Sequence, residues 1–120
     1  MDMGAPVPIL RMFDVEKARA FYLEWLGFAV EFEHRFEPSF PLYMGISRGA
    51  CVLHLSEHHG DACPGSAVRI CVGEIDKLHS ELIAGNYPYY RPGIESMPWG
   101  TREMRVVDPF GNKLVFFTNT

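Results

Sequence analysis

Hydrophobic and polar positions along this chain follow two periods that alternate in a repeating order. Stretches with apolar residues at every second position predict strands, and stretches with apolar residues three and four positions apart predict helices. The predicted strands are Val7–Met12, Phe28–Phe36, Leu42–Ser47, Cys51–Ser56, Ala67–Val72, Thr101–Val107 and Asn112–Thr118, with a short extended piece at Tyr87–Arg91. Within Phe28–Phe36 the alternation predicts one buried face made of Phe28, Val30 and Phe32.

Two helices separate these strands. Asp14 can cap a helix over Val15–Leu26, and Gly27 is a suitable left-handed stop. A second helix is predicted over Ile75–Ala84, ended by Gly85-Asn86. The side chains expected to face the core are Val15, Ala18, Phe21 or Tyr22, Trp25, Ile75, Leu78 and Leu82.

The element order occurs twice, as β-α-β-β-β. A shift of sixty residues superposes Asp14–Lys17 on Glu74–Lys77, which are acid, aliphatic, acid and lysine in both cases. A duplicated unit determines the architecture of a chain. We therefore predict one domain over residues 1–120, with a first module at about 5–57 and a second at about 66–120.

Composition limits the class of protein. The chain has 120 residues, of which 48% are hydrophobic, so one domain can bury a substantial core. Its 15 acidic and 11 basic residues give a net charge of -4 and no basic stripe, which argues against nucleic acid and favours a cationic ligand. No signal-like or membrane-length apolar segment is evident, so we expect a cytoplasmic protein with no membrane partner.

Three cysteines form no C-x-x-C pair, so they suggest neither a disulfide framework nor a zinc knuckle. Cys51 and Cys71 stand in apolar stretches and are expected to be buried thiols. Cys63 is expected to be exposed.

Several motifs together resemble one known superfamily. They are Pro8-Ile9-Leu10, Phe21-Tyr22 with Leu26-Gly27-Phe28, Leu53-His54-Leu55-Ser56, Trp99-Gly100 with Arg102-Glu103, and Asp108-Pro109-Phe110-Gly111-Asn112. With these residues the chain resembles the vicinal-oxygen-chelate superfamily, which includes glyoxalases and extradiol dioxygenases, and within it the bleomycin-resistance proteins. The resemblance implies an α+β fold in which two β-α-β-β-β modules curl mixed sheets around a cleft. It also implies a homodimer whose partner completes that cleft.

The resemblance further indicates where metal ligands would stand in the metal-dependent relatives. Those positions fall on Val7, His54, Ala67 and Val115. Only His54 can bind a metal, whereas a catalytic divalent site needs about three protein ligands. We therefore predict no metal site and no cofactor.

Residues of other types are candidates for binding a ligand in the cleft. Aromatic side chains stack on planar ligands, and carboxylates attract cationic ones. The ligand-binding candidates are Phe40, Tyr43, His54, Trp99, Arg102 and Glu103. For each a structural alternative exists: His54 as a hydrogen-bonded core residue, the aromatics as sheet core, and Glu103 with Arg102 as a surface ion pair.

The loop with His58, His59 and Asp61 contains metal-capable side chains but matches no structural zinc pattern. It is interpreted as a solvated connector between the modules, with part of the cleft entrance as the alternative. No nucleophile elbow, phosphate loop or dinucleotide fingerprint is present.

Two classes of function remain. The favoured one is a metal-independent binding protein that sequesters a bulky, cationic or planar small molecule, such as a bleomycin-like antibiotic, in a dimer cleft. The alternative is a glyoxalase-like enzyme of the lyase, isomerase or oxygenase type, acting on an unknown metabolite with His54 and Glu103 as acid and base.

Overall fold

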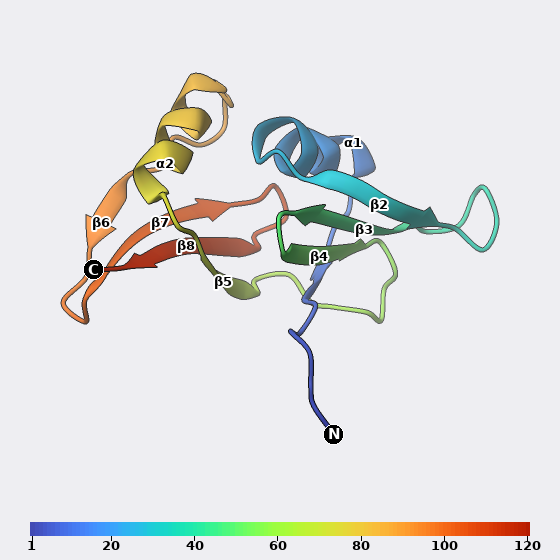
Figure 1. Ribbon diagram of the computed structural model, residues 1–120. Helices are drawn as coiled ribbons and strands as arrows, with labels where there is room; N and C mark the ends of the chain where they lie inside the picture. Colours follow the sequence, from blue (N-terminus) through green and yellow to red (C-terminus); the bar gives the residue numbers. More distant parts are fainter.

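Two four-stranded sheets lie side by side beneath the helices in the computed structural model, which describes residues 1–120 (Figure 1). The first module contains β1 (Ile9–Arg11), α1 (Val15–Ala18), η1 (Arg19–Trp25), β2 (Ala29–His34), β3 (Tyr43–Arg48) and β4 (Cys51–Ser56). The second contains β5 (Ala67–Cys71), α2 (Ile75–Ala84), β6 (Ile94–Ser96), β7 (Thr101–Val107) and β8 (Lys113–Asn119). The β-α-β-β-β order therefore occurs in both halves of the chain.

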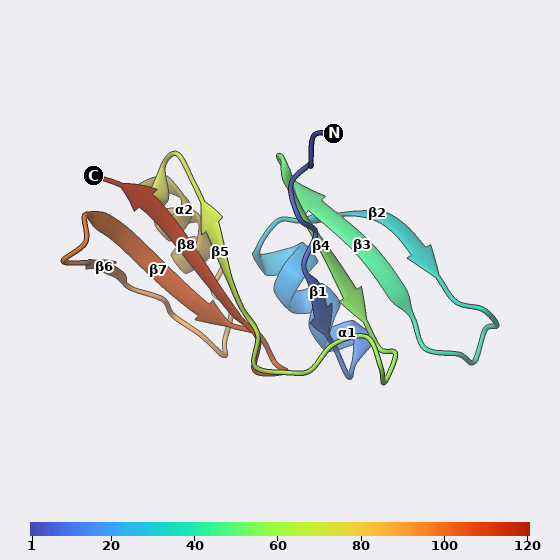
Figure 2. The same ribbon diagram turned by 90° about the horizontal axis from the view of Figure 1, so that it is seen from below.

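The two sheets have the same topology. Their strand orders are β1-β4-β3-β2 and β5-β8-β7-β6. The first strand of each module runs parallel to the last strand, and the other pairs are antiparallel. This confirms the predicted α+β fold with two mixed sheets. The sheets do not close into a barrel, and β1 and β5 form their neighbouring edges (Figure 2).

The first helix begins where the sequence predicts. The Asp14 carboxylate accepts a 3.0 Å hydrogen bond from the backbone N–H of Lys17, as an N-cap does. The helix then widens in η1, where the Leu26 N–H donates to the Phe21 carbonyl five residues earlier. Phe21 and Tyr22 are both fully buried in this segment. Neither this helix nor α2 is long and apolar enough to cross a membrane.

One continuous hydrophobic core joins the modules on the helix side of the sheets. It contains 19 buried residues, drawn from both sheets and from all three helical segments. In the first sheet it includes Met44, Ile46, Leu53 and Leu55, which alternate with residues on the opposite face. Ile75 and Leu82 of α2 enter the same core, as predicted, and Leu78 packs against its edge.

A buried carboxylate links the modules. Asp108, in the turn between β7 and β8, accepts hydrogen bonds from the Tyr22 hydroxyl at 2.6 Å and from the backbone N–H of Asn112 at 2.8 Å. The Asn112 side chain donates to Asp108 at 2.9 Å and to the Arg11 carbonyl at 2.8 Å. The Asp108–Asn112 turn thus contacts both η1 and the end of β1.

The predicted buried face of the second strand is correct for Phe28, which is 6% exposed, and wrong for Val30 and Phe32. All six residues of β2 are exposed, and the register shifts between Val30 and Phe32. Such a bulge adds one residue to a strand and moves the following side chains to the other face. Val30 therefore pairs with core-facing Ile46, whereas Phe32 pairs with Gly45 on the uncovered face.

The prediction for Cys71 is also wrong. Its side chain is exposed, Cys51 is half-buried and Cys63 is exposed as expected. Cys71 alternates along β5 with Ile70 and Val72, which pack against the core, so it lies on the opposite face.

The Tyr22→Phe substitution is expected to destabilise the fold by about 1 to 3 kcal/mol, because Asp108 would remain buried with one donor fewer. Urea denaturation measures this change in the free energy of unfolding. Tyr87→Phe is the matched control, since the Tyr87 ring packs on Trp25 but its hydroxyl makes no hydrogen bond within the chain. The control should change stability by about 0.5 kcal/mol or less, and equal losses in both variants would contradict this role of Asp108.

Candidate functional site

The helices cover one face of each sheet, and no helix covers the other (Figures 1 and 2). The strand registers determine which side chains lie on these uncovered faces. In the first sheet, one row across the strands consists of Phe32, Gly45, His54 and Ile9. In the second sheet, the corresponding row contains Arg105, Val115 and Arg69.

An aromatic cluster lies on the uncovered face of the first sheet. We call Phe32, Tyr43 and His54 the first-sheet cluster. The Tyr43 hydroxyl and His54 Nδ1 are 2.7 Å apart, and the Phe32 ring lies 5.2 Å from the His54 ring in an edge-to-face arrangement. The Phe32 and Tyr43 rings are stacked, with centroids 6.2 Å apart. The structure thus brings together two of the predicted site residues and adds Phe32, an aromatic residue for which the sequence leaves both the cleft and the sheet core open.

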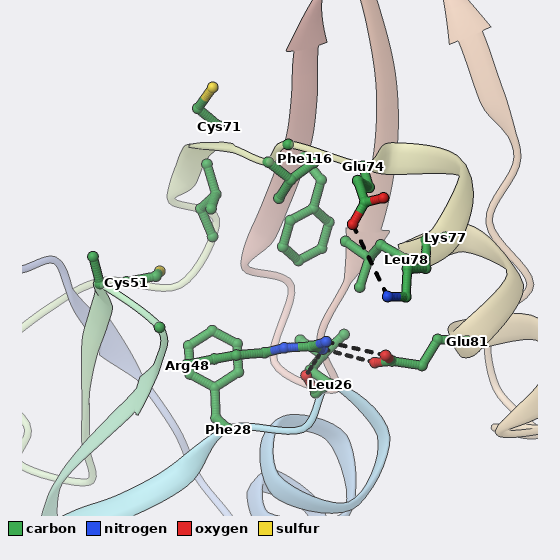
Figure 3. A pocket seen from close by; sticks show the side chains of 15 residues that line it. Leu26, Phe28, Arg48, Cys51, Cys71, Glu74, Lys77, Leu78, Glu81 and Phe116 are labelled. Carbon is green, nitrogen blue, oxygen red and sulfur yellow. Dashed lines mark hydrogen bonds and ion pairs between the residues drawn. The ribbon is translucent and has the colours of Figure 1, made fainter.

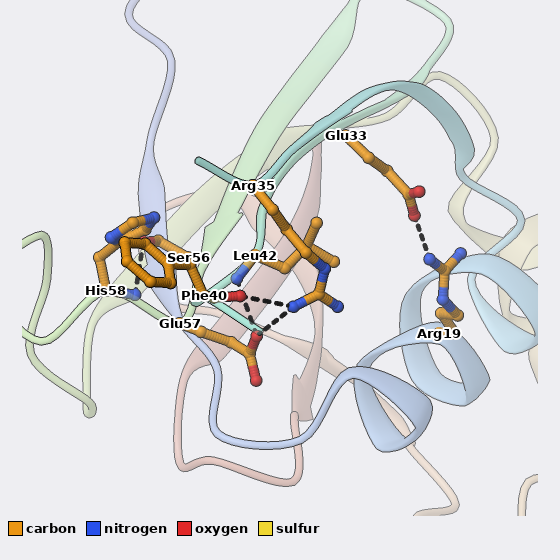
Figure 4. A network of polar contacts seen from close by, with 8 residues as sticks. All are labelled: Arg19, Glu33, Arg35, Phe40, Leu42, Ser56, Glu57 and His58. Carbon is orange, nitrogen blue, oxygen red and sulfur yellow. Dashed lines mark hydrogen bonds and ion pairs between the residues drawn. The ribbon is translucent and has the colours of Figure 1, made fainter. Parts of the chain in front are cut away.

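Phe40 lies in the loop that follows β2, outside the first-sheet cluster. Arg35 donates a 2.7 Å hydrogen bond to the Phe40 carbonyl and lies 3.8 Å from Glu57, whose carboxylate accepts from the Leu42 N–H at 2.9 Å (Figure 4). These contacts hold the loop against the end of β4. Phe40 is 44% exposed.

The connector after β4 is folded by its own polar groups. Ser56 donates to Asp61 at 2.6 Å and accepts from the His58 N–H at 3.0 Å, while Arg11 donates to the His58 carbonyl at 2.7 Å. His59 is exposed. Asp61 therefore caps a turn beside His58, which agrees with the interpretation of this segment as a connector.

A second cluster lies on the uncovered face of the second sheet. We call Arg69, Trp99, Thr101 and Glu103 the second-sheet cluster. The Glu103 carboxylate, only 7% exposed, accepts from Arg69 at 2.9 and 3.2 Å, from Thr101 at 2.6 Å and from the Trp99 indole at 3.1 Å. The hydrogen bonds from Arg69 and Thr101 lower the pKa of Glu103 to about 2. Trp99 itself is 65% exposed.

Arg102 does not belong to this cluster. It lies on the opposite face of β7, where its guanidinium donates to Asp76 of α2 at 2.6 and 2.9 Å. Neighbouring residues of a strand point to opposite faces. The predicted side-by-side placement of Arg102 and Glu103 is therefore wrong, and Arg69 is the arginine that pairs with Glu103.

Four positions correspond to the metal ligands of metal-dependent relatives, and the residues at these positions do not fit a metal ion. Val7, Ala67 and Val115 have no ligand atoms in their side chains, and Nδ1 of His54 is bonded to Tyr43. Elsewhere in the chain, no three His, Cys, Asp or Glu side chains are grouped so that they could hold a metal. A catalytic divalent site needs about three protein ligands.

A cavity of about 420 Å³ lies beside the second-sheet cluster. Glu95, Glu103, Arg105 and Val115 line it together with Tyr90 and Met97. On this face, the strand residues Arg69, Arg105 and Lys113 face the same side as Glu95 and Glu103. Basic and acidic side chains are therefore mixed on this face. The prediction of a cationic ligand gains no support from it.

Sequence reasoning gave no indication of a second cavity, of about 470 Å³, between the modules (Figure 3). Phe28 and Cys51 line it from the first module, and Val72 and Phe116 from the second. Arg48 bridges its mouth to Glu81 of α2, with contacts of 2.7 and 3.1 Å. Burial raises the pKa of the Cys51 thiol, which makes it a poor nucleophile.

Comparison with known proteins identifies the family. Residues 2–120 match the family described as glyoxalase superfamily protein. The chain belongs to the glyoxalase superfamily. This agrees with the motifs around Phe21-Tyr22 and Asp108–Asn112, and with the duplicated modules.

Solved structures of the superfamily are similar along the whole chain. A bleomycin-binding protein from bleomycin-producing Streptomyces verticillus, solved with copper(II)-bleomycin, is 31% identical with a TM-score of 0.74, and the match covers 100% of this chain and 99% of that one. A bleomycin-binding protein complexed with bleomycin is 22% identical with a TM-score of 0.76, covering 98% and 100%. A glyoxalase-related enzyme from Clostridium phytofermentans is 20% identical with a TM-score of 0.76, covering 100% and 98%. A search of curated proteins finds no match.

These similarities place the chain on the bleomycin-resistance-like branch of the glyoxalase superfamily. The two less similar structures establish the fold alone, since one is a binding protein and the other is described as an enzyme. Function in such a superfold depends on the residues of the site rather than on the fold.

Acid unfolding should detect the hydrogen bonds to Glu103. Because its pKa in the folded state is about 2, below the usual value of 4.5, its stabilising contribution is complete above about pH 4.5 and is lost as the pH falls towards 2. In Glu103→Gln the free energy of unfolding should therefore depend less on pH over this range. Urea denaturation at each pH measures this dependence. Glu95→Gln is the matched control, because Glu95 lies opposite Glu103 on β6 and makes no ion pair. An unchanged pH profile for Glu103→Gln would contradict the prediction.

Proposed function

We propose that this protein binds and sequesters a bulky, partly planar organic molecule on the uncovered faces of its sheets, without a metal ion. The observation that carries the proposal is the exposure of aromatic rings on these faces. Phe32 is 42% exposed and Trp99 is 65% exposed, although both are large apolar side chains. Rings held in this way offer surfaces on which planar ligands stack.

The similarity to bleomycin-binding proteins supports the same function. The 31% identical protein from Streptomyces verticillus was solved with copper(II)-bleomycin, and its match covers this whole chain. We propose a ligand of that general size and shape, with bleomycin as the first compound to test.

An enzymatic function has less support from the site. The proposed acid and base, His54 and Glu103, lie on different sheets. Glu103 also accepts hydrogen bonds from three side chains, and its pKa of about 2 makes it a weak base near neutral pH. This arrangement favours a structural role for Glu103, in which it orients Trp99 and Arg69.

We also propose that the protein forms a homodimer whose second copy completes the binding surface. Its support is the apolar area left at the edge of the first sheet, where Val7 is 42% and Ile9 is 39% exposed. Strand β1, which begins at Ile9, has only three residues and pairs on one side only. Exposed apolar side chains beside an unpaired strand edge can be covered by a second copy of the chain.

Titration with bleomycin is expected to quench the fluorescence of Trp99 and to leave that of Trp25 unchanged, because Trp99 is 65% and Trp25 only 6% exposed. Trp99→Phe should abolish the quenching, and calorimetry should still detect weakened binding through the remaining contacts. Prior dialysis of the protein against EDTA should not change the affinity for metal-free bleomycin. If calorimetry detects no heat with wild-type protein, bleomycin is not a ligand, and an affinity lost on EDTA treatment would contradict metal-independent binding.

Sedimentation equilibrium should give twice the mass of the 13.6 kDa chain. Ile9→Glu is expected to shift the protein to monomers, because a charge would be buried in the interface without a partner. Tyr89→Glu is the control, since it replaces an 81% exposed aromatic residue in the loop between α2 and β6. A wild-type protein that sediments as a monomer at all concentrations would refute the dimer.

A further inference from the structure

The contact between the Tyr43 hydroxyl and His54 Nδ1 favours one position of the imidazole proton. Burial and the charge of Asp61 raise the pKa of the Tyr43 hydroxyl, so it remains a protonated donor at neutral pH. His54 Nδ1, at 2.7 Å, is the only acceptor within reach of this hydroxyl in the chain. If Nδ1 carried the proton instead, the phenolic proton would have no partner in the protein. The Tyr43 proton is therefore satisfied within the protein only when a neutral His54 accepts at Nδ1 and carries its own proton on Nε2.

The Nε2–H group has no acceptor within the protein. His54 makes its one side-chain hydrogen bond through Nδ1. The Nε2 atom has no partner and is not fully buried, so a bound molecule can reach it. Its neighbour across the strands on one side is Gly45, and on the other it is Ile9. Neither side chain can accept a hydrogen bond, so the donor is available to a molecule that binds on this face.

A flat aromatic ring is held beside this donor. The Phe32 ring lies directly over Gly45, and a Cβ atom at that position would collide with it. The ring meets His54 edge to face at 88° and is stacked with Tyr43 at 15°. Because the rings constrain one another, the donor and the ring surface keep a defined relative position, which lowers the ordering cost of binding.

We propose that the first-sheet cluster recognises a flat aromatic group that carries a hydrogen-bond acceptor at its edge, such as a ring nitrogen or a carbonyl oxygen, through the Nε2–H of His54. This inference rests on the proposed function and specifies the chemistry of the ligand at one part of the site. It selects a neutral acceptor rather than a cation. A ligand group that offers only donors leaves Nε2–H unpaired when water is displaced, which carries a free-energy cost.

The tautomer of His54 is tested without any ligand. Nitrogen NMR of labelled protein at about pH 8, where histidine is neutral, separates a nitrogen that bears a proton from one that does not. We expect the proton of His54 on Nε2 in the wild type. Tyr43→Phe removes the donor to Nδ1 and should give a mixture of both tautomers. A wild-type His54 with its proton on Nδ1 would overturn the proposal, whether or not the protein binds bleomycin.

Ligand preference is tested with isoquinoline and indole, two flat bicyclic probes that are neutral at about pH 8. Isoquinoline has a ring-nitrogen acceptor, whereas indole has only an N–H donor. We expect isoquinoline to bind about tenfold more tightly, as followed by the NMR signals of His54 and Phe32. His54→Phe keeps an aromatic ring but loses the donor, so it should remove this preference.

Three outcomes count against the proposal. The first is equal or tighter binding of indole, and the second is an unchanged preference in His54→Phe. The third is no response of the His54 signals to either probe at about 20 mM, a concentration at which fragments of this size bind preformed sites. If bleomycin binds and the probes show no preference, the inference fails and the proposed function stands. If bleomycin does not bind but isoquinoline is preferred, bleomycin is not the ligand and the acceptor chemistry of the site stands.

Discussion

The hydrogen bond between Tyr22 and Asp108 is the contact on which the arrangement of the two modules depends. A buried carboxylate is stable only when its oxygens are bonded. Here the hydroxyl of Tyr22, two backbone N–H groups and the side chain of Asn112 satisfy it. Asn112 then extends the network to the carbonyl of Arg11, at the end of β1. Both modules share this network, which joins η1 and the end of β1 to the turn between β7 and β8. The Asp108–Asn112 turn is thus a structural junction between the two modules.

The modules share one framework and carry different chemistry at equivalent positions. Strand registers align Tyr43 with Glu103 and His54 with Val115, because each pair occupies the same place in its sheet. In the first sheet these positions hold a phenol and an imidazole bonded to each other. In the second they hold a carboxylate bonded to Arg69 and a valine. A duplicated scaffold therefore presents two faces with different side chains.

The sequence predicts the elements of this fold better than it predicts the contacts of the site. The bounds of α2 and β7 match the predicted ranges, since strong periodicity and turn residues define them. The bulge in β2 is not visible in the alternation, because the extra residue changes the face of Phe32 without changing the residue types. Tyr43 and His54 belong to one hairpin, so local register brings them together. The Arg69–Glu103 pair depends on β8 lying between β5 and β7, which only the tertiary fold determines.

The core and the proposed ligand surface lie on opposite faces of the same strands. The core lies on the helix side, where Met44, Ile46 and Leu53 are fully buried. The uncovered faces contribute little to that core, so their side chains can change with a smaller loss of stability. On these faces a residue type is restricted only where side chains pack on one another. Gly45 is an example, because a Cβ atom there would collide with the Phe32 ring. Function in such a superfold depends on the residues of the site, and in this chain the uncovered faces can vary without removing residues from the core.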